Sequence, residues 1–239
     1  MKKLIFWALI IAVTTTSCGL FGKRVTGSGN IKTETRTAGQ FNAVDVSGAI
    51  DVYVKTDSVS SIRVEADDNL LEFVETHNDG GTLHIHERNG FNLRSRKDIK
   101  VYVSGPEFRH FEASGACEII SENKITSPST IDIDVSGASG INLELNAPAV
   151  KADLSGACNV TLKGETKNLD LNGSGASKFY CFDLLAEDVD VEISGAGHAD
   201  VSASVKLAVG VSGAGTVKYK GNPSVNQRVS GAGSVSKAE

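Results

Sequence analysis

IDIDVSGASGINLELNAPAVKADLSG, residues 131–156, carries the pattern that decides the fold. Steps of two from Ile131 give a mostly apolar column that passes through Val135 and Gly137 and ends at Leu143. Such alternation, with a period of two, predicts β-strands rather than helices. Ser-Gly-Ala interrupts the stretch without shifting the alternation, so we interpret the tripeptide as a corner between two strands.

The same tripeptide organises most of the chain. It begins at eight serines: Ser47, Ser114, Ser136, Ser155, Ser174, Ser194, Ser212 and Ser230. The last seven copies recur at intervals of 18 to 22 residues, and the residues between them differ. A period of this length indicates a solenoid, because each unit buries its apolar face only by stacking on its neighbours. We therefore predict an all-β fold, with a right-handed parallel β-helix or β-solenoid of about 19 residues per repeat over residues 110–239.

The glycine of each tripeptide falls on the same alternate positions as the apolar residues, which are expected to point inward. The predicted corner glycines are Gly48, Gly115, Gly137, Gly156, Gly175, Gly195, Gly213 and Gly231. We expect a tight bend at which a side chain would collide with the opposite wall of the coil. A catalytic serine is the alternative interpretation. It is disfavoured because no G-x-S-x-G motif accompanies the tripeptide and all eight copies cannot be active.

The N-terminal third repeats the pattern less regularly. Residues 41–54, FNAVDVSGAIDVYV, carry the same signature and are interpreted as a first coil. Further strand-like runs lie at 61–66, 82–86 and 99–103. Because their spacing is irregular, residues 41–109 are predicted to form a less regular β region that packs on, or continues, the solenoid. Helical periodicity is nearly absent, and residues 69–75 are the best candidate for one helical turn.

The first residues have the layout of a signal peptide over residues 1–17: two lysines, an apolar run from Leu4 to Val13, and small residues before Cys18. A cysteine in this place resembles the lipobox of bacterial lipoproteins, although Thr15 stands where leucine is usual. The resemblance implies lipidation of Cys18, with residues 18–40 as lipid anchor and tether. Gly19 follows the cysteine in place of an aspartate, which argues against retention in the inner membrane. We expect an exported outer-membrane lipoprotein on the periplasmic or surface face, and simple secretion is the alternative.

The charge balance excludes one class of partner. Without residues 1–17 the chain has 222 residues, 22 Lys and Arg, 29 Asp and Glu, and a net charge of −7. A chain this acidic is not expected to bind nucleic acid. Trp7 is the sole tryptophan and lies in the predicted signal peptide, so the mature chain has no indole for stacking on a sugar ring.

The chain resembles a known family, the auto-transporter adhesins of the head GIN type, common in exported proteins of Bacteroidetes-like bacteria. The resemblance rests on Gly27-Ser28-Gly29-Asn30, on the segment Phe41 to Val54 and on the serial Ser-Gly-Ala coils, and it covers nearly the whole mature chain. It implies a β-helical fold and a role in adhesion. It brings no catalytic residues with it.

A ridge of acidic residues is predicted on the outward face of the coils: Asp132, Asp134, Asp153, Asp170, Asp190 and Glu192, interrupted by Lys151. Stacked carboxylates repel one another unless a cation neutralises them. A weak calcium site is one interpretation. A solvated, solubilising face is the favoured one, because the G-G-x-G-x-D repeat of calcium-binding coils is absent.

The cysteines and histidines give no clear site. Cys117 and Cys158 occupy the same position two coils apart, about 9.6 Å by strand spacing, which is too far for a disulfide. Together with Cys181 they are interpreted as small buried residues. His84 and His86 share one face of a strand, but no third zinc ligand with suitable spacing is evident. These two, and His77, His110 and His198, are interpreted as ordinary surface residues.

The favoured function is a non-catalytic cell-envelope lipoprotein whose solenoid faces form a binding or adhesion platform. Its expected partners are the membrane, through the lipid anchor, and a host or cell-surface protein or glycan; no cofactor and no metal are expected. One alternative is a carbohydrate-active β-helix enzyme such as a polysaccharide lyase, which fold analogy alone supports, since Arg94, Arg96 and Lys97 lie outside the repeats. Another is an envelope scaffold that self-associates through the end of the solenoid, around Val229 to Val235.

Overall fold

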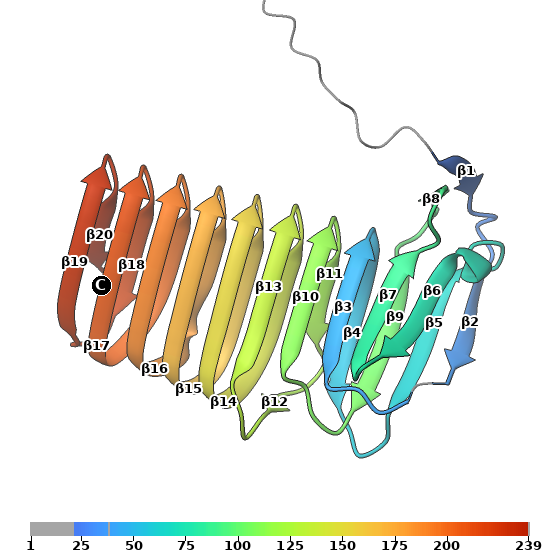
Figure 1. The fold of residues 1–239 in the computed structure, drawn as a ribbon, viewed down its shortest axis with the longest axis horizontal. Coiled ribbons are helices and arrows are strands. Elements are labelled where there is room, and N and C mark those ends of the chain that lie inside the picture. The colour runs from blue at the N-terminus through green and yellow to red at the C-terminus, as the bar shows by residue number, and fades with distance from the viewer. Residues whose placement is uncertain (1–21, 38, 239) are drawn as a thin grey trace, which may run out of the picture.

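The computed structural model describes residues 22–37 and 39–238. Their strands stack into an elongated β-solenoid, with the C-terminal coil at one end and a group of N-terminal strands at the other (Figure 1). The predicted helical turn over residues 69–75 is confirmed as a short 3-10 turn, η1 (Leu71–Phe73). No helix in this part of the chain is long and apolar enough to cross a membrane.

Each coil contributes one strand to each of two walls. The strand that leads into the Ser-Gly-Ala corner belongs to what we call the leading wall. Its members are β3 (Ala43–Gly48), β10 (His110–Gly115), β13 (Ile131–Gly137), the second halves of β14 (Gly140–Gly156), β15 (Asn159–Gly175), β16 (Lys178–Gly195) and β17 (His198–Gly213), and β19 (Ser224–Gly231). All of these strands run parallel.

The strand that follows the corner belongs to the trailing wall. Its members are β4 (Ile50–Thr56), β11 (Glu118–Ser121), the first halves of β14 to β17, β18 (Thr216–Lys220) and β20 (Ser234–Lys237). The short strand β12 (Ile125–Thr126) pairs with β14 beside the bend that joins the two walls. Each strand from β14 to β17 continues through the bend between the two walls without interruption.

Neighbouring coils pair in register, so that residues of one kind stack upon each other. Corner glycine lies opposite corner glycine, from Gly137 to Gly156 to Gly175. Inward residues of both walls, such as Leu143 and Val191, are fully buried and form one core between the walls. This stacking confirms the predicted parallel β-solenoid with repeats of about 19 residues.

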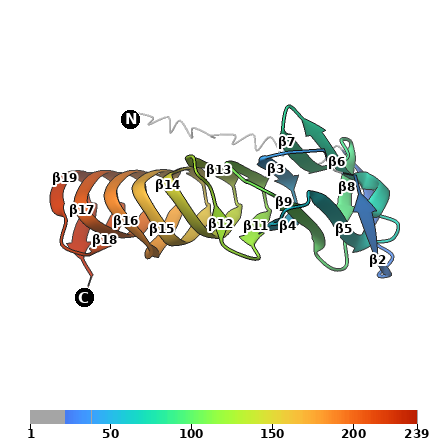
Figure 2. The same cartoon turned by 90° about the horizontal axis from the view of Figure 1, so that it is seen from below.

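A group of N-terminal strands, here called the cap, closes the first coil. β7 (Thr82–Glu87) runs parallel to β3, and β9 (Ile99–Gly105) runs parallel to β4. Antiparallel partners cover these two: β6 (Val74–Asp79) on β7, β5 (Ser61–Asp67) on β9, and β2 (Ile31–Arg36) on β5. β1 (Lys23–Thr26) pairs with β8 (Phe91–Arg94) in a separate two-stranded sheet. Figure 2 shows the cap strands gathered at one end of the stack.

The structure corrects one predicted boundary and confirms the predicted first coil. Residues 18–40 were predicted as a tether, but β1 and β2 lie within that range and pair with strands from residues 61–94. The mixture of Gly, Thr and charged residues in this segment gave no strand signal. β3 and β4, within the predicted first coil of residues 41–54, pair directly with β10 and β11. The less regular part is the cap, whose strands β5 to β9 lie in the sequence between β4 and β10.

The corner glycines are required for a reason other than the predicted one. The expectation was an inward glycine facing the opposite wall, but the corner is exposed in most coils. All eight corner glycines have positive φ, between 77° and 114°, which L side chains rarely adopt. A Cβ on Gly156 would also stand 2.5 Å from the carbonyl oxygen of Gly137. The neighbouring coil, stacked against the corner, therefore excludes a side chain.

A buried carboxylate holds the N-terminal segment on the cap. Asp67, at the end of β5, is fully buried and lies against Gly27 and Gly29 of the Gly-Ser-Gly-Asn segment. Its carboxylate accepts hydrogen bonds from the backbone N–H of Gly29 at 2.5 Å and of Arg96 at 3.2 Å, and from the Ser95 hydroxyl at 2.6 Å. Burial alone would raise the pKa of Asp67, but these hydrogen bonds outweigh it and lower the pKa.

Asp67→Asn is expected to lower the free energy of unfolding by about 2 kcal/mol, because an amide group would turn an N–H toward buried donors. Since the pKa of Asp67 is lowered in the folded state, its stabilising contribution is present above the ordinary aspartate pKa and is lost as the pH falls through the folded value. Urea unfolding at several pH values measures both effects. A loss for Asp67→Asn that stayed constant down to the lowest pH would contradict this role.

Candidate binding face on the leading wall

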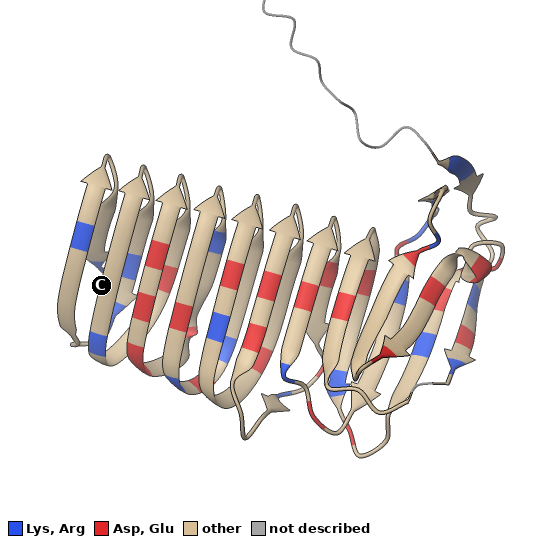
Figure 3. Cartoon of the chain, in the orientation of Figure 1, with Lys and Arg blue, Asp and Glu red and all other residues tan. Residues whose placement is uncertain are grey.

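The outward side chains of the leading wall form three parallel columns. The column beside the corner holds the eight serines from Ser47 to Ser230. The middle column consists of Asp45, Glu112, Asp134, Asp153, Asn172, Glu192, Gly210 and Arg228. The outer column contains His110, Asp132, Lys151, Asp170 and Asp190. Acidic residues, coloured red, recur along the strands of this wall from coil to coil (Figure 3).

The predicted acidic ridge is therefore two columns, and Lys151 stands between Asp132 and Asp170 in only one of them. Asp45 and Glu112 extend the middle column toward the cap and were not predicted. Counting two residues back from Ser47 and Ser114 would have found both. The predicted ridge was drawn only from residues of the regular repeats after residue 130, although residues 41–54 were interpreted as a first coil.

A groove of about 530 Å³ runs between the middle column and the serine column. Carboxylates of Glu112, Asp134, Asp153 and Glu192 line one side, and corner serines from Ser136 to Ser212 line the other. Carboxylates accept hydrogen bonds, and serine hydroxyls both accept and donate them. The groove spans several coils with the same groups repeated about every 4.8 Å, so it suits an extended ligand rich in hydrogen-bond donors.

Partial burial and neighbouring carboxylates raise the pKa of two aspartates in these columns. Partial burial raises the pKa of Asp134, and the charges of Asp153 and Asp132 raise it further, while His110 acts in the opposite direction. Burial likewise raises the pKa of Asp170, with Asp190 and Asp153 adding to the effect. The acidic columns thus oppose folding at neutral pH and favour a bound cation or donor group.

Asp134→Asn is expected to stabilise the protein at pH 7 by about 0.5 kcal/mol, a small value because solvent screens the half-exposed carboxylate. A raised folded pKa means that stability is lost as the pH rises from the ordinary aspartate pKa through the folded value. The gain should therefore vanish in acid. Thermal melts from pH 3.5 to 7 measure it, with Glu144→Gln as control, since Glu144 lies 3.4 Å from Lys124 on the trailing wall. A gain that persisted in acid would contradict the repulsion.

The three described cysteines are free thiols and are buried, as predicted. The Cys117 Sγ lies 3.5 Å from the hydroxyl of Ser139 in the intervening coil. Desolvation raises the pKa of Cys117 and Cys158, and it raises the pKa of Cys181 to about 12. Nothing in this arrangement activates a thiolate.

Thiol labelling of the native protein is therefore expected to be slow, and Cys181 should react last. A Cys18→Ser variant removes the fourth thiol from the assay. Timed labelling with a chromogenic disulfide reagent, followed by peptide mass analysis, measures each site. Rapid reaction of Cys181 in folded protein, at the rate reached in denaturant, would contradict its burial.

No catalytic arrangement is found among the described residues. Two histidines lie beside the acidic columns, His84 at 2.7 Å from Asp45 and His110 at 3.8 Å from Asp134. The basic residues Arg94 and Arg96 belong to the cap, where Arg96 donates to the Gly27 carbonyl oxygen. Likewise, no three His, Cys, Asp or Glu side chains in residues 22–37 and 39–238 are already grouped to hold a metal ion. The predicted signal peptide and the lipidation site Cys18 lie outside the described residues.

Three of the five histidines lie together on one hairpin of the cap. His84 and His86 share a face of β7, as predicted, and His77 stands directly opposite His84 on β6. His110 lies in the outer column of the leading wall, while His198 lies 2.9 Å from Asp200 on the trailing wall. The turn Asn78-Asp79-Gly80-Gly81 joins β6 to β7 and would have been the sequence signal for this pairing.

Comparison with known proteins agrees with this architecture. A family model described as "Putative auto-transporter adhesin, head GIN domain" matches residues 40–223. A search of curated proteins returned no match.

Several solved structures share the fold. A "putative adhesin" of Bacteroides fragilis NCTC 9343 has a TM-score of 0.83 at 19% identity, with 90% of this chain and 100% of that chain covered. A "putative adhesin" of Parabacteroides merdae ATCC 43184 has a TM-score of 0.71 at 20% identity, with 91% and 100% covered. A "putative lipid binding protein" of Parabacteroides distasonis ATCC 8503 has a TM-score of 0.68 at 20% identity, with the same shares covered.

Proposed function

Because the chain belongs to the family described as "Putative auto-transporter adhesin, head GIN domain", we propose that it is a non-catalytic cell-envelope lipoprotein whose leading wall is a binding platform for adhesion. The observation that carries the proposal is the groove between the acidic middle column and the serine column. Its groups repeat from coil to coil, as a surface for a long ligand requires.

The ligand is an extended, donor-rich chain, a glycan or a protein segment of a host or another cell surface. Hydroxyl or ammonium groups of such a chain would donate to Glu112, Asp134 and Asp153 in successive coils and to Glu192 in the coil beyond Asn172. Each contact is weak alone, and the repeated contacts add along the chain. The raised pKa of Asp134 supports this: partial burial and then the charges of Asp153 and Asp132 disfavour its ionised form, which a donor or cation in the groove would stabilise.

Binding to glycan and surface-protein arrays tests the platform. The wild-type chain is compared with an Asp134→Asn, Asp153→Asn, Glu192→Gln variant and with a control, Glu118→Gln, Glu144→Gln, on the trailing wall. We expect the first variant to lose at least about tenfold in affinity and the control to bind as wild type. Absence of any ligand, equal binding by both variants, or turnover of a bound polysaccharide would overturn the proposal.

The membrane attachment is a separate part of the proposal. Lipid on Cys18 would hold the chain at the outer membrane, on the periplasmic or surface face. Cell fractionation and mass analysis of the N-terminal peptide test it: acyl chains are expected on Cys18, and Cys18→Ala should move the protein to the soluble fraction. An unmodified Cys18 in membrane-bound protein would contradict lipidation.

A second candidate function, a self-associating envelope scaffold, is favoured by the C-terminal coil. Within the described residues no strand pairs with the outer edges of β19 and β20, and Val225 and Val229 at inward positions are 39% and 43% exposed. Sedimentation velocity tests it, with Val229→Lys against Val59→Lys in the cap as control. Concentration-dependent association lost only in Val229→Lys supports the scaffold, and a monomer at all concentrations rules it out.

A further inference from the structure

A cluster of three histidines and a glutamate lies on the outer face of the β6–β7 hairpin in the cap. In the antiparallel register His77 stands opposite His84, and Glu75 stands opposite His86. Alternate residues of a strand share a face, so these four side chains form two adjacent cross-strand pairs. The binding role proposed above does not use them.

The imidazole ring of His77 already has, from each of the other two rings, the separation that a shared metal ion needs. The ring centroid of His77 lies 4.9 Å from that of His84 and 5.5 Å from that of His86. Two imidazoles bound to one tetrahedral zinc ion, each at about 2.0–2.1 Å through nitrogen, have centroids about 5 Å apart. The rings do not yet aim at one point, since His77 and His84 are stacked at 20°. Rotation about the χ2 torsion, which is broadly distributed for histidine, can direct the ring nitrogens toward one point without moving either strand.

The hydrogen bonds of two of the rings point to the same chemistry. His84 Nδ1 lies 2.7 Å from the Asp45 carboxylate, and His86 Nδ1 lies 3.1 Å from the backbone carbonyl oxygen of Glu87. When Nδ1 donates to such partners, the lone pair is on Nε2, free for a metal. A carboxylate or carbonyl oxygen behind each imidazole is the usual outer shell of histidine metal sites.

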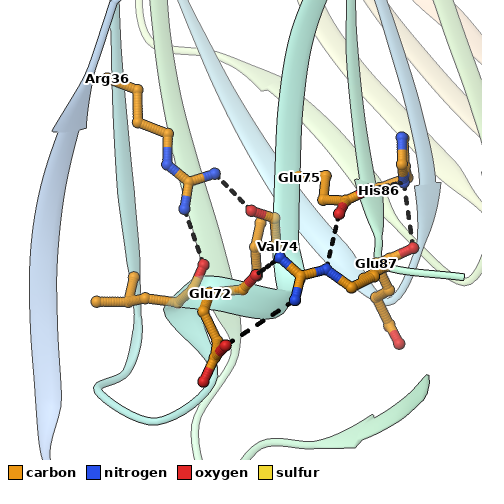
Figure 4. Close-up of polar contacts among 8 residues, drawn as sticks. Arg36, Glu72, Val74, Glu75, His86 and Glu87 are labelled. Carbon is orange, nitrogen blue, oxygen red and sulfur yellow. Dashed lines mark hydrogen bonds and ion pairs between the residues drawn. The ribbon is translucent and has the colours of Figure 1, made fainter.

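Glu75 can complete the set. Arg88 donates to its Oε1 at 2.8 Å, which orients the carboxylate on the face of the hairpin. Oε2, its other oxygen, lies 3.9 Å from Nδ1 of His86. Figure 4 shows the side chains of Glu75 and His86 near one another.

We propose that His77, His84 and His86, with Glu75 as fourth ligand, bind one zinc ion on the outer face of the β6–β7 hairpin. Three imidazoles and one carboxylate suit the borderline character of Zn²⁺ and not Ca²⁺ or Mg²⁺, which take oxygen ligands. The ion would tie β6 to β7 and so fix the antiparallel edge of the cap beside the first coil. Asp45, which bonds His84, is the first acid of the middle column, so the site adjoins the binding face.

Calorimetric titration with Zn²⁺ and thermal melts test the site, using the full chain with Cys18→Ser so that this thiol does not bind the metal. We expect one ion per chain and a raised melting temperature. His77→Ala and His86→Ala should each weaken binding by more than about 100-fold, and Asp45→Asn, which removes only the outer-shell carboxylate, by about 10- to 100-fold. His198→Ala, a histidine beside Asp200 on the trailing wall, is the matched control and should bind as the parent does.

The ligand set has a spectroscopic readout besides affinity. Co²⁺ in place of Zn²⁺ should give the visible absorption of a four-coordinate ion, and His77→Ala should abolish it. Circular dichroism confirms that the variants fold, which is expected because His77 is exposed. No stoichiometric zinc binding by the parent chain, or binding that survives both His77→Ala and His86→Ala, would overturn the proposal, whatever the ligand arrays show.

Discussion

Gly156→Ala is expected to lower the free energy of unfolding by at least about 3 kcal/mol, or to prevent folding. The corner glycine has φ of 112°, a conformation that costs an L residue about 1–2 kcal/mol. Its new Cβ would also stand 2.5 Å from the carbonyl oxygen of Gly137, and backbone cannot yield as a flexible side chain does. Because the neighbouring corners stack in register, the displacement would spread to adjacent coils. Urea unfolding followed by circular dichroism measures the loss.

Gly80→Ala is the matched control for this prediction. Gly80 also has a positive φ, 57°, but a Cβ there would meet nothing within 4 Å. Its replacement should cost only about 1 kcal/mol, the conformational part of the effect. The difference between the two variants isolates the close approach of stacked coils. Equal losses would mean that the approach at the corner contributes nothing.

Phe179→Ala is expected to cost about 3–5 kcal/mol, because it empties a fully buried aromatic site in the middle of the stack. Phe179 lies at the start of β16, and its ring fills space left by an inward glycine: a Cβ on Gly173 would be 2.8 Å from Cε2 of the ring. The coils on either side are held in register and cannot collapse into the cavity. Equilibrium unfolding and thermal melts measure the loss.

Tyr180→Ala controls for that prediction within the same strand. Tyr180 follows Phe179, points outward and is 40% exposed, so its loss should cost less than about 1 kcal/mol. The contrast tests the inward and outward alternation on which the fold depends. Similar losses for both variants would show that residues 178–181 do not alternate as described.

The solenoid was predictable because its information is local and repeated. Period-two alternation identifies the inward residues, and the recurrence of Ser-Gly-Ala sets the coil length, so that Val135, Leu154 and Leu171 could be assigned to the core from the sequence alone. The role of the corner glycine was predicted less well. Sequence shows that a residue is small, but not whether positive φ or a neighbouring chain requires it.

The cap was not predictable in the same way. β2 pairs with β5 across some thirty residues, and β1 with β8 across more than sixty, and no repeat in the sequence links these partners. Such pairings depend on tertiary fit, which local propensity does not encode. The strand pair that brings His77 opposite His84 was missed for a different reason: its signal is local, a turn typical of a hairpin, and it was not used.

The sequence predicted that the acidic residues point outward, but not that they form two columns. The outward direction of Asp134 and Asp153 follows from the alternation along each strand, whereas the two columns follow from the register between coils. The groove beside them depends on the serine column as well, because small serines leave open the space that the carboxylates border. The sequence alone identifies these serines and carboxylates, but the serines were interpreted only as corner residues and not as part of an outward surface.

The in-register parallel stack is tested most directly by distances between nitroxide labels placed along one column. Labels at Ser114→Cys with Ser212→Cys, and at Ser114→Cys with Ser230→Cys, in a chain whose native cysteines are replaced, span five and six coils. At about 4.8 Å per coil, pulsed electron resonance should give narrow distributions near 24 Å and 29 Å, with the second longer by one coil. Distances that do not increase from the first pair to the second, or that are spread broadly, would contradict the stack.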